Sequence, residues 1–235
     1  VNLTVDTVTV KLSIIIPVLN EESSLSRLSS HLQSIRRQGH EVIIVDGGSA
    51  DNTLALSYEL ADQVIVSKAG RAVQMNSGAS IANGNVFVFL HVDTFLPDNA
   101  LQIIMAAMTG NAWGRFNVRL SSNRLVFRLI ESLINLRSCL TSIATGDQAM
   151  FIEKSLFNRV AGFPEIALME DVALSRRLKK IEKPVCIKQK VITSSRRWEN
   201  KGIMATVLLM WKLRLYYFLG VSPEKLNRLY RHVSR

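Results

Sequence analysis

The sequence predicts an α/β fold: a mainly parallel central sheet, helices on both of its faces, and a C-terminal helical segment. Two observations predict this class. Strand-like and helix-like segments alternate through the first hundred residues, and the strand-like segments are almost continuously apolar, as in sheets buried on both faces. The chain of 235 residues is also long enough for one large domain with a sizeable core.

The first half is predicted to contain four strands and the helices between them. The strands are expected at residues 11–20, 40–49, 62–67 and 86–94. The helices are expected to begin after Asn20, at about Asp51 and at Gly70. We expect Pro17 to stop the first strand, Asn20 to cap the first helix, and Gly84 to close the third.

The second half is less regular but shows the same two kinds of segment. We expect strands at 111–120, 147–155 and 185–193, and helices at 124–140, 155–162, 171–181 and 202–220, followed by a basic tail. No linker rich in Pro, Gly or Ser and no internal repeat interrupts the chain. We therefore expect a single domain over residues 1–235.

The charge balance narrows the choice of partner. The chain has 29 Lys and Arg against 19 Asp and Glu, a net charge of +10, which favours nucleic acid, a phosphorylated substrate or an acidic membrane surface. Dedicated nucleic-acid binding is disfavoured because the chain has no long basic arm and no aromatic RNA-binding motif.

The most apolar segment, 202–220, is interrupted by Lys212 and Arg214, so it is too short to cross a bilayer. We expect a packed helix there; the alternative is an interfacial helix, because aromatic and cationic residues occur together. Residues 1–13 lack the features of a secretory signal peptide. Cys139 and Cys186 lack zinc-site spacing, so we expect two buried thiols and a cytoplasmic protein, free or peripheral at the inner membrane face.

Polar residues follow three of the buried strands, where sheets of this kind bind ligands. They are the turn around Asn20, Asp46, and the pair His91 and Asp93. The glycine-rich motifs that cradle phosphates and the nucleophile elbow of hydrolases are absent. Asp93, with His91 two residues before it, can instead supply one or two ligands to a divalent cation. The alternative is that Asp93 caps the next turn and His91 belongs to the core.

Two further groups of residues are candidates for chemistry. Glu170 and Asp171 directly precede a predicted helix, so Asp171 is either an N-cap or a general base. In the segment that follows the last strand, Arg196 and Arg197 suit phosphate contacts and Trp198 suits stacking on a sugar or base. The alternative there is an exposed basic turn with one packed aromatic residue.

Four segments together resemble glycosyltransferase family 2, inverting enzymes with the Rossmann-like GT-A fold. They are "SIIIPVLNEE", "VIIVDGGSADNT", "MNSGASIANGNVFVFLHVDT" and "GFPEIALMEDVALSRRL", and the resemblance runs from about residue 11 to about 198. The forms "LHVDT", "GDQAMF", "MEDVALSRRL" and "SSRRW" are most similar to a bacterial branch associated with selenium or arsenosugar gene clusters. The resemblance implies a nucleotide-sugar-binding half (about 11–110), an acceptor and catalytic half (about 111–198) and C-terminal helices (about 199–235).

The resemblance also implies a role for each matching residue. Donor-nucleotide positions match Pro17, Asn20, Glu21, Asp46, Arg71, Asn76 and Asp93. Asp93 matches the last aspartate of the family's D-x-D metal motif, in which His91 replaces the first, and Asp171 matches the catalytic base. Positions near the acceptor and the diphosphate match Glu170, Arg197 and Trp198. Ser194 departs from the glutamine of the family's Q-x-x-R-W motif.

The expected function is therefore metal-assisted, inverting transfer of a sugar, a hexose in particular, from a UDP-sugar to an acceptor hydroxyl. Mn²⁺ or Mg²⁺ would assist the leaving diphosphate. The alternatives are a peripheral-membrane enzyme that acts on polyprenyl phosphate and a sugar-nucleotide-binding protein without turnover. The matching Asp171 disfavours the second of these. Nucleotidyl transfer is disfavoured because its glycine- and arginine-rich opening loop is absent.

Overall fold

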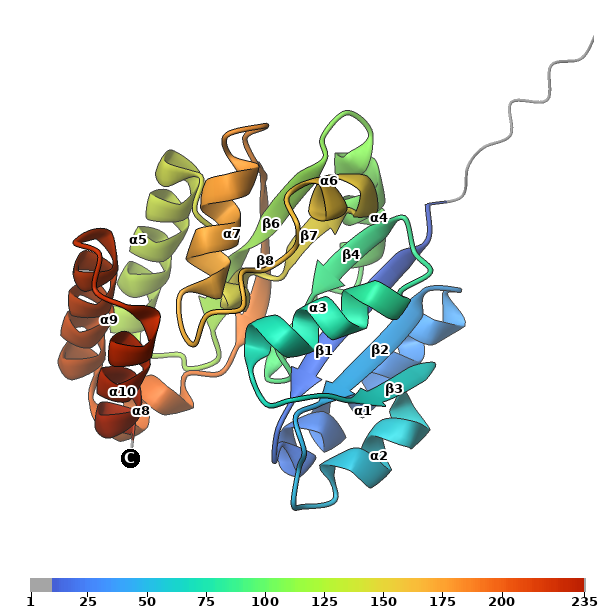
Figure 1. Ribbon diagram of the computed structural model, residues 1–235, viewed down its shortest axis with the longest axis horizontal. Coiled ribbons are helices and arrows are strands. Elements are labelled where there is room, and N and C mark those ends of the chain that lie inside the picture. The colour runs from blue at the N-terminus through green and yellow to red at the C-terminus, as the bar shows by residue number, and fades with distance from the viewer. Residues whose placement is uncertain (1–9, 235) are drawn as a thin grey trace, which may run out of the picture.

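The computed structural model describes residues 10–234, so most of the segment searched for a signal peptide lies outside the described residues. One eight-stranded sheet runs through the molecule in the order β3–β2–β1–β4–β7–β6–β8–β5 (Figure 1). The strands are β1 (Leu12–Val18), β2 (Glu41–Asp46), β3 (Gln63–Val66), β4 (Val86–Phe89), β5 (Thr94–Phe95), β6 (Trp113–Leu120), β7 (Met150–Glu153) and β8 (Val185–Thr193).

Helices lie on both faces and at one end of this sheet. They are α1 (Glu22–Arg37), α2 (Thr53–Leu60), α3 (Arg71–Ile81), α4 (Ala100–Met108), α5 (Leu125–Thr141), α6 (Lys154–Arg159), α7 (Glu170–Leu178), α8 (Arg196–Lys201), α9 (Ile203–Phe218) and α10 (Pro223–Ser234), with a 3₁₀ turn, η1 (Gly146–Gln148). The pairs β1–β2, β1–β4, β2–β3 and β6–β8 are parallel. Because β7 is antiparallel to both β4 and β6, the strands β1, β4, β6 and β8 all run in one direction. The predicted α/β class is confirmed.

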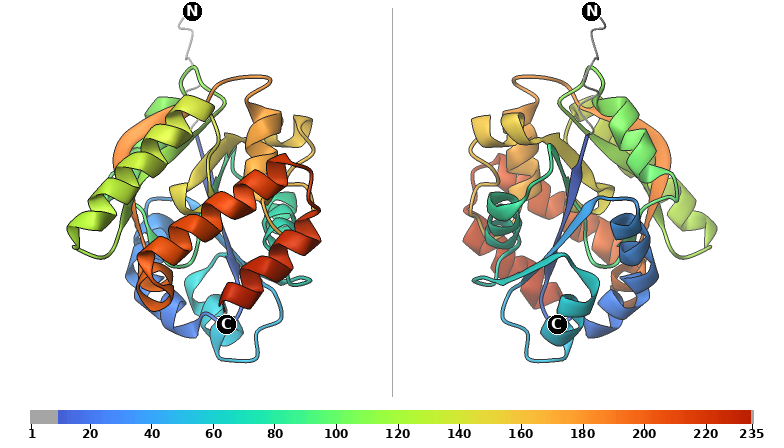
Figure 2. Two further views of the ribbon diagram at one scale, coloured as in Figure 1. Left: turned by 90° about the vertical axis from the view of Figure 1, so that its left-hand side faces the viewer. Right: turned by 90° about the vertical axis from the view of Figure 1, so that its right-hand side faces the viewer.

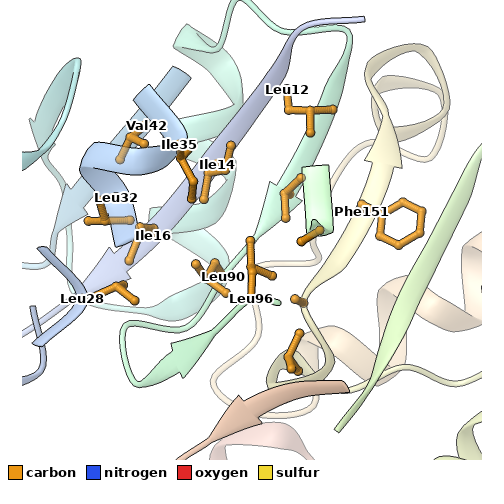
Figure 3. Packing of buried hydrophobic residues seen from close by; sticks show 14 of the residues in the cluster. Leu12, Ile14, Ile16, Leu28, Leu32, Ile35, Val42, Leu90, Leu96 and Phe151 are labelled. Atoms are coloured by element: carbon orange, nitrogen blue, oxygen red, sulfur yellow. The ribbon is translucent and has the colours of Figure 1, made fainter. Parts of the chain in front are cut away.

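The core has two layers because successive residues of a strand face opposite sides of the sheet. Leu12, Ile14 and Ile16 of β1 pack against the apolar stripe of α1, together with α2 and α4 (Figure 3). Ile15 points the other way and packs with residues of α3, α6 and α7. Full burial of such a side chain stabilises the fold by about 1.5–3 kcal/mol, so the apolar strands hold their carboxyl ends firmly in place.

Two local predictions in the first half are wrong. Asn20 does not cap α1: its side-chain oxygen accepts a hydrogen bond from the backbone N–H of Ala50 (2.8 Å), and no side chain caps the helix. Gly84 does not close α3, which ends at Ile81. The glycine is required by close packing, since an added Cβ would lie 2.6 Å from the Ser13 hydroxyl.

Strand ends also differ from the prediction. β1 continues through Pro17, which is tolerated because the pairing with β4 stops at Ile15. The fourth strand ends at Phe89, so His91 and Asp93 lie in the turn between β4 and β5. Helix α4 was not predicted, because its apolar sequence has no polar face to reveal a helical period.

The C-terminal region forms three helices in place of one helix and a tail. Figures 1 and 2 show α8, α9 and α10 together beside α5 and α7. Among residues 10–234, none of the helices is both long enough and apolar enough to cross a membrane. The prediction of two buried thiols is wrong, since Cys139 is exposed on α5 and Cys186 is only partly buried.

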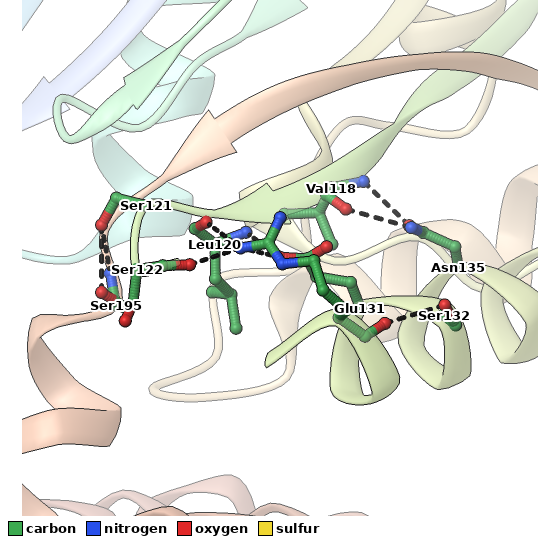
Figure 4. A network of polar contacts seen from close by, with 9 residues as sticks. Val118, Leu120, Ser121, Ser122, Glu131, Ser132, Asn135 and Ser195 are labelled. Atoms are coloured by element: carbon green, nitrogen blue, oxygen red, sulfur yellow. Dashed lines mark hydrogen bonds and ion pairs between the residues drawn. The ribbon is translucent and has the colours of Figure 1, made fainter. Parts of the chain in front are cut away.

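Helix α5 takes the place of a missing strand along β6. β7 pairs only with Trp113 and Gly114, the first two residues of β6. The later N–H groups on that side of β6 therefore need other partners. Asn135 bonds both the N–H and the carbonyl of Val118 (2.8 and 3.0 Å), and Glu131 accepts from the N–H of Leu120 (2.7 Å) (Figure 4). These side chains fix α5 on the sheet edge and leave its other side free.

Candidate active site

A cavity of about 870 Å³ opens where β1, β4, β6 and β8 end. The loops that follow these strands, together with η1, α5 and α7 to α10, line it. Predicted site residues in its lining are Glu21, Arg71, His91, Asp93, Glu170, Asp171, Arg196, Arg197 and Trp198. Side chains far apart in the sequence are therefore brought to one place, at the carboxyl ends of strands that run in the same direction.

Some predicted nucleotide residues lie outside this lining. Asp46 is fully buried, and its carboxylate accepts hydrogen bonds from the N–H groups of Gly48 (3.0 Å) and Ser49 (2.8 Å) and from the Ser49 hydroxyl. The Ser49 hydroxyl also accepts from the N–H of Asn20 (2.9 Å). Asp46 thus shapes the loop after β2 and connects it to the loop after β1.

Asn76 and Pro17 also lie away from the lining. The side-chain amide of Asn76 donates to the carbonyl of Phe163 (2.8 Å) and accepts from its N–H (2.9 Å). Both of its polar groups therefore fix the loop between α6 and α7. Pro17 lies within β1, one residue before the strand ends.

Asp171 is held by the backbone of a distant segment. The position that caps α7 is Met169, whose left-handed backbone (φ 71°) turns the chain into the helix, so the N-cap interpretation of Asp171 is wrong. One carboxylate oxygen of Asp171 accepts a hydrogen bond from the N–H of Gly146 (2.9 Å). An anion in a first helical turn is also stabilised by the helix dipole. Asp171 is thus a fixed carboxylate at the cavity.

The sequence alone did not identify Asp147, which follows Gly146 in η1 and faces the cavity with its side chain 58% exposed. Its Oδ1 lies 3.1 Å from His91 Nδ1. Partial desolvation by the surrounding cavity wall raises the pKa of Asp147, but the hydrogen bond and charge of His91 and the charges of Arg71 and Arg197 outweigh it and lower the pKa. The sequence placed Asp147 at the start of the predicted strand 147–155 and in the form GDQAMF, but the strand begins only at Met150, and Asp147 lies in η1.

The side-chain groups of the cavity that suit a divalent cation are carboxylate oxygens. Within residues 10–234 there is no group of three or more His, Cys, Asp and Glu side chains placed to hold a metal ion. His91 uses Nδ1 toward Asp147, and its Nε2 edge packs so closely on Gly146 that an added Cβ there would overlap the ring. Two carboxylates that line the cavity, Asp93 and Asp147, carry the oxygen donors that a hard divalent cation prefers.

Glu170 is a second carboxylate beside Asp171. It is 6% exposed, and burial together with the charge of Asp171 raises its pKa, against the opposing effects of Arg71 and His91. A carboxyl group whose pKa is raised by burial and a neighbouring charge is frequent in catalytic sites.

Two arginines and a tryptophan close the site from α8. Arg197 lies over the ring of Tyr230, with its guanidinium carbon 4.6 Å from the ring centre. Burial and the charge of Arg71 lower the pKa of Arg197, whereas Asp147 and Asp93 raise it. Arg196 bonds the hydroxyls of Ser194 (3.2 Å) and Ser24 (3.3 Å). Trp198 packs against the apolar cluster between β6 and α5, so part of its surface is structural.

A sheet of this order, covered by helices and carrying a charged cavity at its carboxyl ends, is the GT-A glycosyltransferase fold. Residues 13–155, more than half of the chain, match Glycosyl transferase family 2, and the chain belongs to this family. None of the curated proteins matches it.

Several solved structures have the same fold at low sequence identity. A mannosyltransferase from Pyrobaculum calidifontis in complex with GDP-Man and Mn²⁺ has 18% identity and a TM-score of 0.61, over 79% of this chain and 57% of that one. TarS from S. aureus has 17% identity and a TM-score of 0.61, over 85% and 65%. Glucosyl-3-phosphoglycerate synthase from Mycobacterium tuberculosis, with Mn²⁺, UDP and glucosyl-3-phosphoglycerate, has 16% identity and a TM-score of 0.62, over 91% and 81%. The chain spans less than two thirds of the first two proteins.

Proposed function

We propose that the protein is an inverting glycosyltransferase that moves a sugar from a nucleotide-diphospho-sugar, a UDP-sugar in particular, to an acceptor hydroxyl. The observation that carries the proposal is Asp171, a carboxylate fixed by the Gly146 N–H in the same cavity as Asp93 and Arg197. Proteins of the same fold bind UDP or GDP-Man together with Mn²⁺.

In this reaction the acceptor oxygen attacks the anomeric carbon from the face opposite the diphosphate. Asp171 accepts the hydroxyl proton as the new C–O bond forms, and the bond to the diphosphate oxygen breaks, so that its electron pair leaves with UDP. Positioned base catalysis typically contributes about 10²–10⁴-fold in rate. A cation, Mn²⁺ or Mg²⁺, held by Asp93 and Asp147 would neutralise the charge that develops on the diphosphate. Arg197 would contact the same group.

The finer assignments rest on the resemblance of the motifs. We propose a hexosyl donor, a bacterial enzyme of the branch associated with selenium or arsenosugar gene clusters, and a cytoplasmic location. Pro17, Asn20, Glu21, Asp46, Arg71 and Asn76 would surround the nucleotide, directly or by shaping its loops.

A specific observation favours the peripheral-membrane alternative. Helices α5 and α9 each expose an apolar stripe at the margin of the cavity. The exposed residues are Leu125, Val126, Leu129, Leu133, Leu136 and Leu140 on α5, and Met204, Leu208, Trp211, Leu215 and Phe218 on α9. Glu131 is the only acidic residue on the two helices, and it is buried. Apolar and cationic faces together suit an anionic leaflet, and an acceptor such as polyprenyl phosphate would be reached from there.

The experiment that tests the enzymatic role replaces Asp171 with Asn, which keeps the size of the side chain and removes its basicity. We expect UDP affinity to survive and transfer to fall by about 10²-fold or more, because only the base is lost. The measurement is the rate of UDP release from UDP-sugars. When the acceptor is omitted, this release reports the slow hydrolysis of the UDP-sugar by water. Glu224→Gln, which removes an acid from the first turn of α10, is the matched control. Equal rates for Asp171→Asn and wild type would favour the binding-protein alternative.

A further inference from the structure

Two arginines in the cavity have no role in the reaction described above. Arg137 of α5 and Arg214 of α9 both line it, together with Asp171. The Nε and Nη2 atoms of Arg137 are buried and have no hydrogen-bond partner among the described residues 10–234. The bond that it does make runs from Nη1 to the carbonyl of Ile143 (3.3 Å). Neither arginine takes part in an ion pair within 4.0 Å in that part of the chain.

The charges of these two side chains act on each other and on Asp171. Burial lowers the pKa of Arg137 to about 10, the charge of Arg214 acts in the same direction, and Asp171 opposes it. Burial also lowers the pKa of Arg214, and Asp171 and Asp147 oppose that change. Both guanidinium groups stay protonated at neutral pH. The buried N–H groups of Arg137 that lack a partner, beside the second cation Arg214, are costly unless an anion accepts their hydrogen bonds.

The charges that act on the pair differ in part from those that act on Arg197. Arg197 is influenced by Arg71, Asp147 and Asp93, where the diphosphate and its cation would lie. Asp171, beside which the acceptor hydroxyl must lie to lose its proton, influences both Arg137 and Arg214, and Asp147 influences Arg214 as well. Asp171 is thus the carboxylate that the two arginines share, and it is not among the groups that act on Arg197.

We propose that Arg137 and Arg214 bind a phosphate group on the acceptor. The inference deepens the proposed function and rests on it. Two guanidinium forks present many donors in a plane that matches phosphate oxygens, and a dianion balances two cations. The phosphate belongs either to a small phosphorylated metabolite or to a lipid, since Leu133, Leu136 and Leu140 line the same cavity as the two arginines.

The test measures phosphate binding to protein saturated with UDP and Mg²⁺, so that the donor side is occupied. The soluble probes are inorganic phosphate and glycerol 3-phosphate, and glycerol is the uncharged control. Their binding is measured by calorimetry at constant ionic strength. The lipid probes are phosphatidylcholine vesicles with and without phosphatidic acid. The variants are Arg137→Gln and Arg214→Gln. Arg37→Gln on α1 and Lys188→Gln on β8 each remove one exposed charge away from α5, α9 and the cavity lining and serve as matched controls.

We expect a phosphate probe to bind wild type, and each cavity variant to weaken that binding about tenfold or more, because charge-assisted bonds are lost. The control variants should bind as wild type does. Arginine-dependent binding of glycerol 3-phosphate supports a soluble acceptor, and arginine-dependent binding only of phosphatidic acid vesicles supports a lipid acceptor.

Equal weakening by the controls, or no binding of any probe that depends on Arg137 or Arg214, would overturn the proposal. Unchanged UDP affinity shows that a variant is folded, and Arg214→Gln carries the test if Arg137→Gln does not fold. Failure of the wild-type protein to bind UDP would overturn the proposed function but not the phosphate site. Phosphate affinity would in that case be measured without nucleotide, with the same variants.

Discussion

Asp93 and Asp147 are the residues on which the proposed cation site depends, and they reach the cavity from different segments, the turn after β4 and η1. Asp147 also bonds His91, the residue that departs from the family's D-x-D motif. A carboxylate therefore lies 3.1 Å from the ring of His91, contributed by a residue 56 positions later in the sequence.

The first prediction concerns nucleotide and cation. UDP should bind wild type about tenfold or more tightly with Mn²⁺ or Mg²⁺ than without, because the cation joins the diphosphate to the two carboxylates. Asp93→Ala and Asp147→Ala should remove this dependence. Asp46→Ala should weaken UDP binding with or without the cation, because it disrupts the loop after β2. Calorimetry that gave equal UDP affinity for wild type and Asp93→Ala would remove Asp93 from the cation site.

A second residue-scale prediction follows from the raised pKa of Glu170, which burial and Asp171 cause. In the unfolded chain this carboxyl loses its proton near pH 4.3, earlier than in the folded protein. Stability therefore falls as pH rises from that value through the folded pKa. Glu170→Gln removes this penalty and should raise the melting temperature at pH 7, with the gain vanishing near pH 4. A pH-independent difference between the melting temperatures of the two proteins would contradict the raised pKa of Glu170.

At the scale of elements, the two sides of α5 differ: the inner side bonds the sheet, and the outer side is exposed and apolar. Its inner side replaces a strand along β6 through Glu131 and Asn135, and places Arg137 two residues further on, in the cavity wall. Its outer side exposes leucines, Leu125 being 85% exposed, and α9 presents a similar stripe that includes Trp211. Surfaces of this kind on a folded protein indicate a binding partner or a membrane.

Binding to anionic vesicles should therefore depend on these two helices. Attachment is expected at low salt and should weaken as salt rises, since exposed charges are screened beyond about 10 Å at 0.1 M. Leu129→Gln combined with Leu208→Gln should reduce the bound fraction about tenfold or more, because each leucine buried in the bilayer contributes about 1.5–3 kcal/mol. Tyr58→Gln, equally exposed on α2, is the control. Absence of sedimentation with anionic vesicles at low salt would leave α9 as a packed helix only.

At the scale of the whole molecule, the sequence was sufficient for the alternating first half, because each buried strand is a continuous apolar run. It was insufficient where a side chain finds its partner far along the chain. Asn20 has the composition of an N-cap, yet Ala50, thirty positions away, takes its hydrogen bond. Asp171 has the same appearance, yet the Gly146 N–H holds it.

The part of the site that the sequence alone did not reveal has the same cause. No local pattern marks Arg137 or Arg214 as a site residue, and Asp147 belonged to the predicted strand 147–155. Only the packing of η1, α5 and α9 brings these three side chains to one cavity. The roles of Pro17, Asn76 and Asp46 toward the nucleotide stay predictions. The polar groups of Asn76 and Asp46 bond neighbouring loops, and Pro17 lies within β1.

Gly146 and Asp147 are consecutive residues, which limits how far their two contacts can move apart. Gly146 holds Asp171 through its N–H, and Asp147 contacts His91 through its carboxylate. Neighbouring Cα atoms are about 3.80 Å apart across a trans peptide, so the two contacts can separate only by the reach of one residue and a short side chain. An insertion between them would lengthen that reach and, in the proposed reaction, alter the distance between Asp171 and the diphosphate. We therefore expect substitutions elsewhere in the cavity to be tolerated, but no change in the length of this segment.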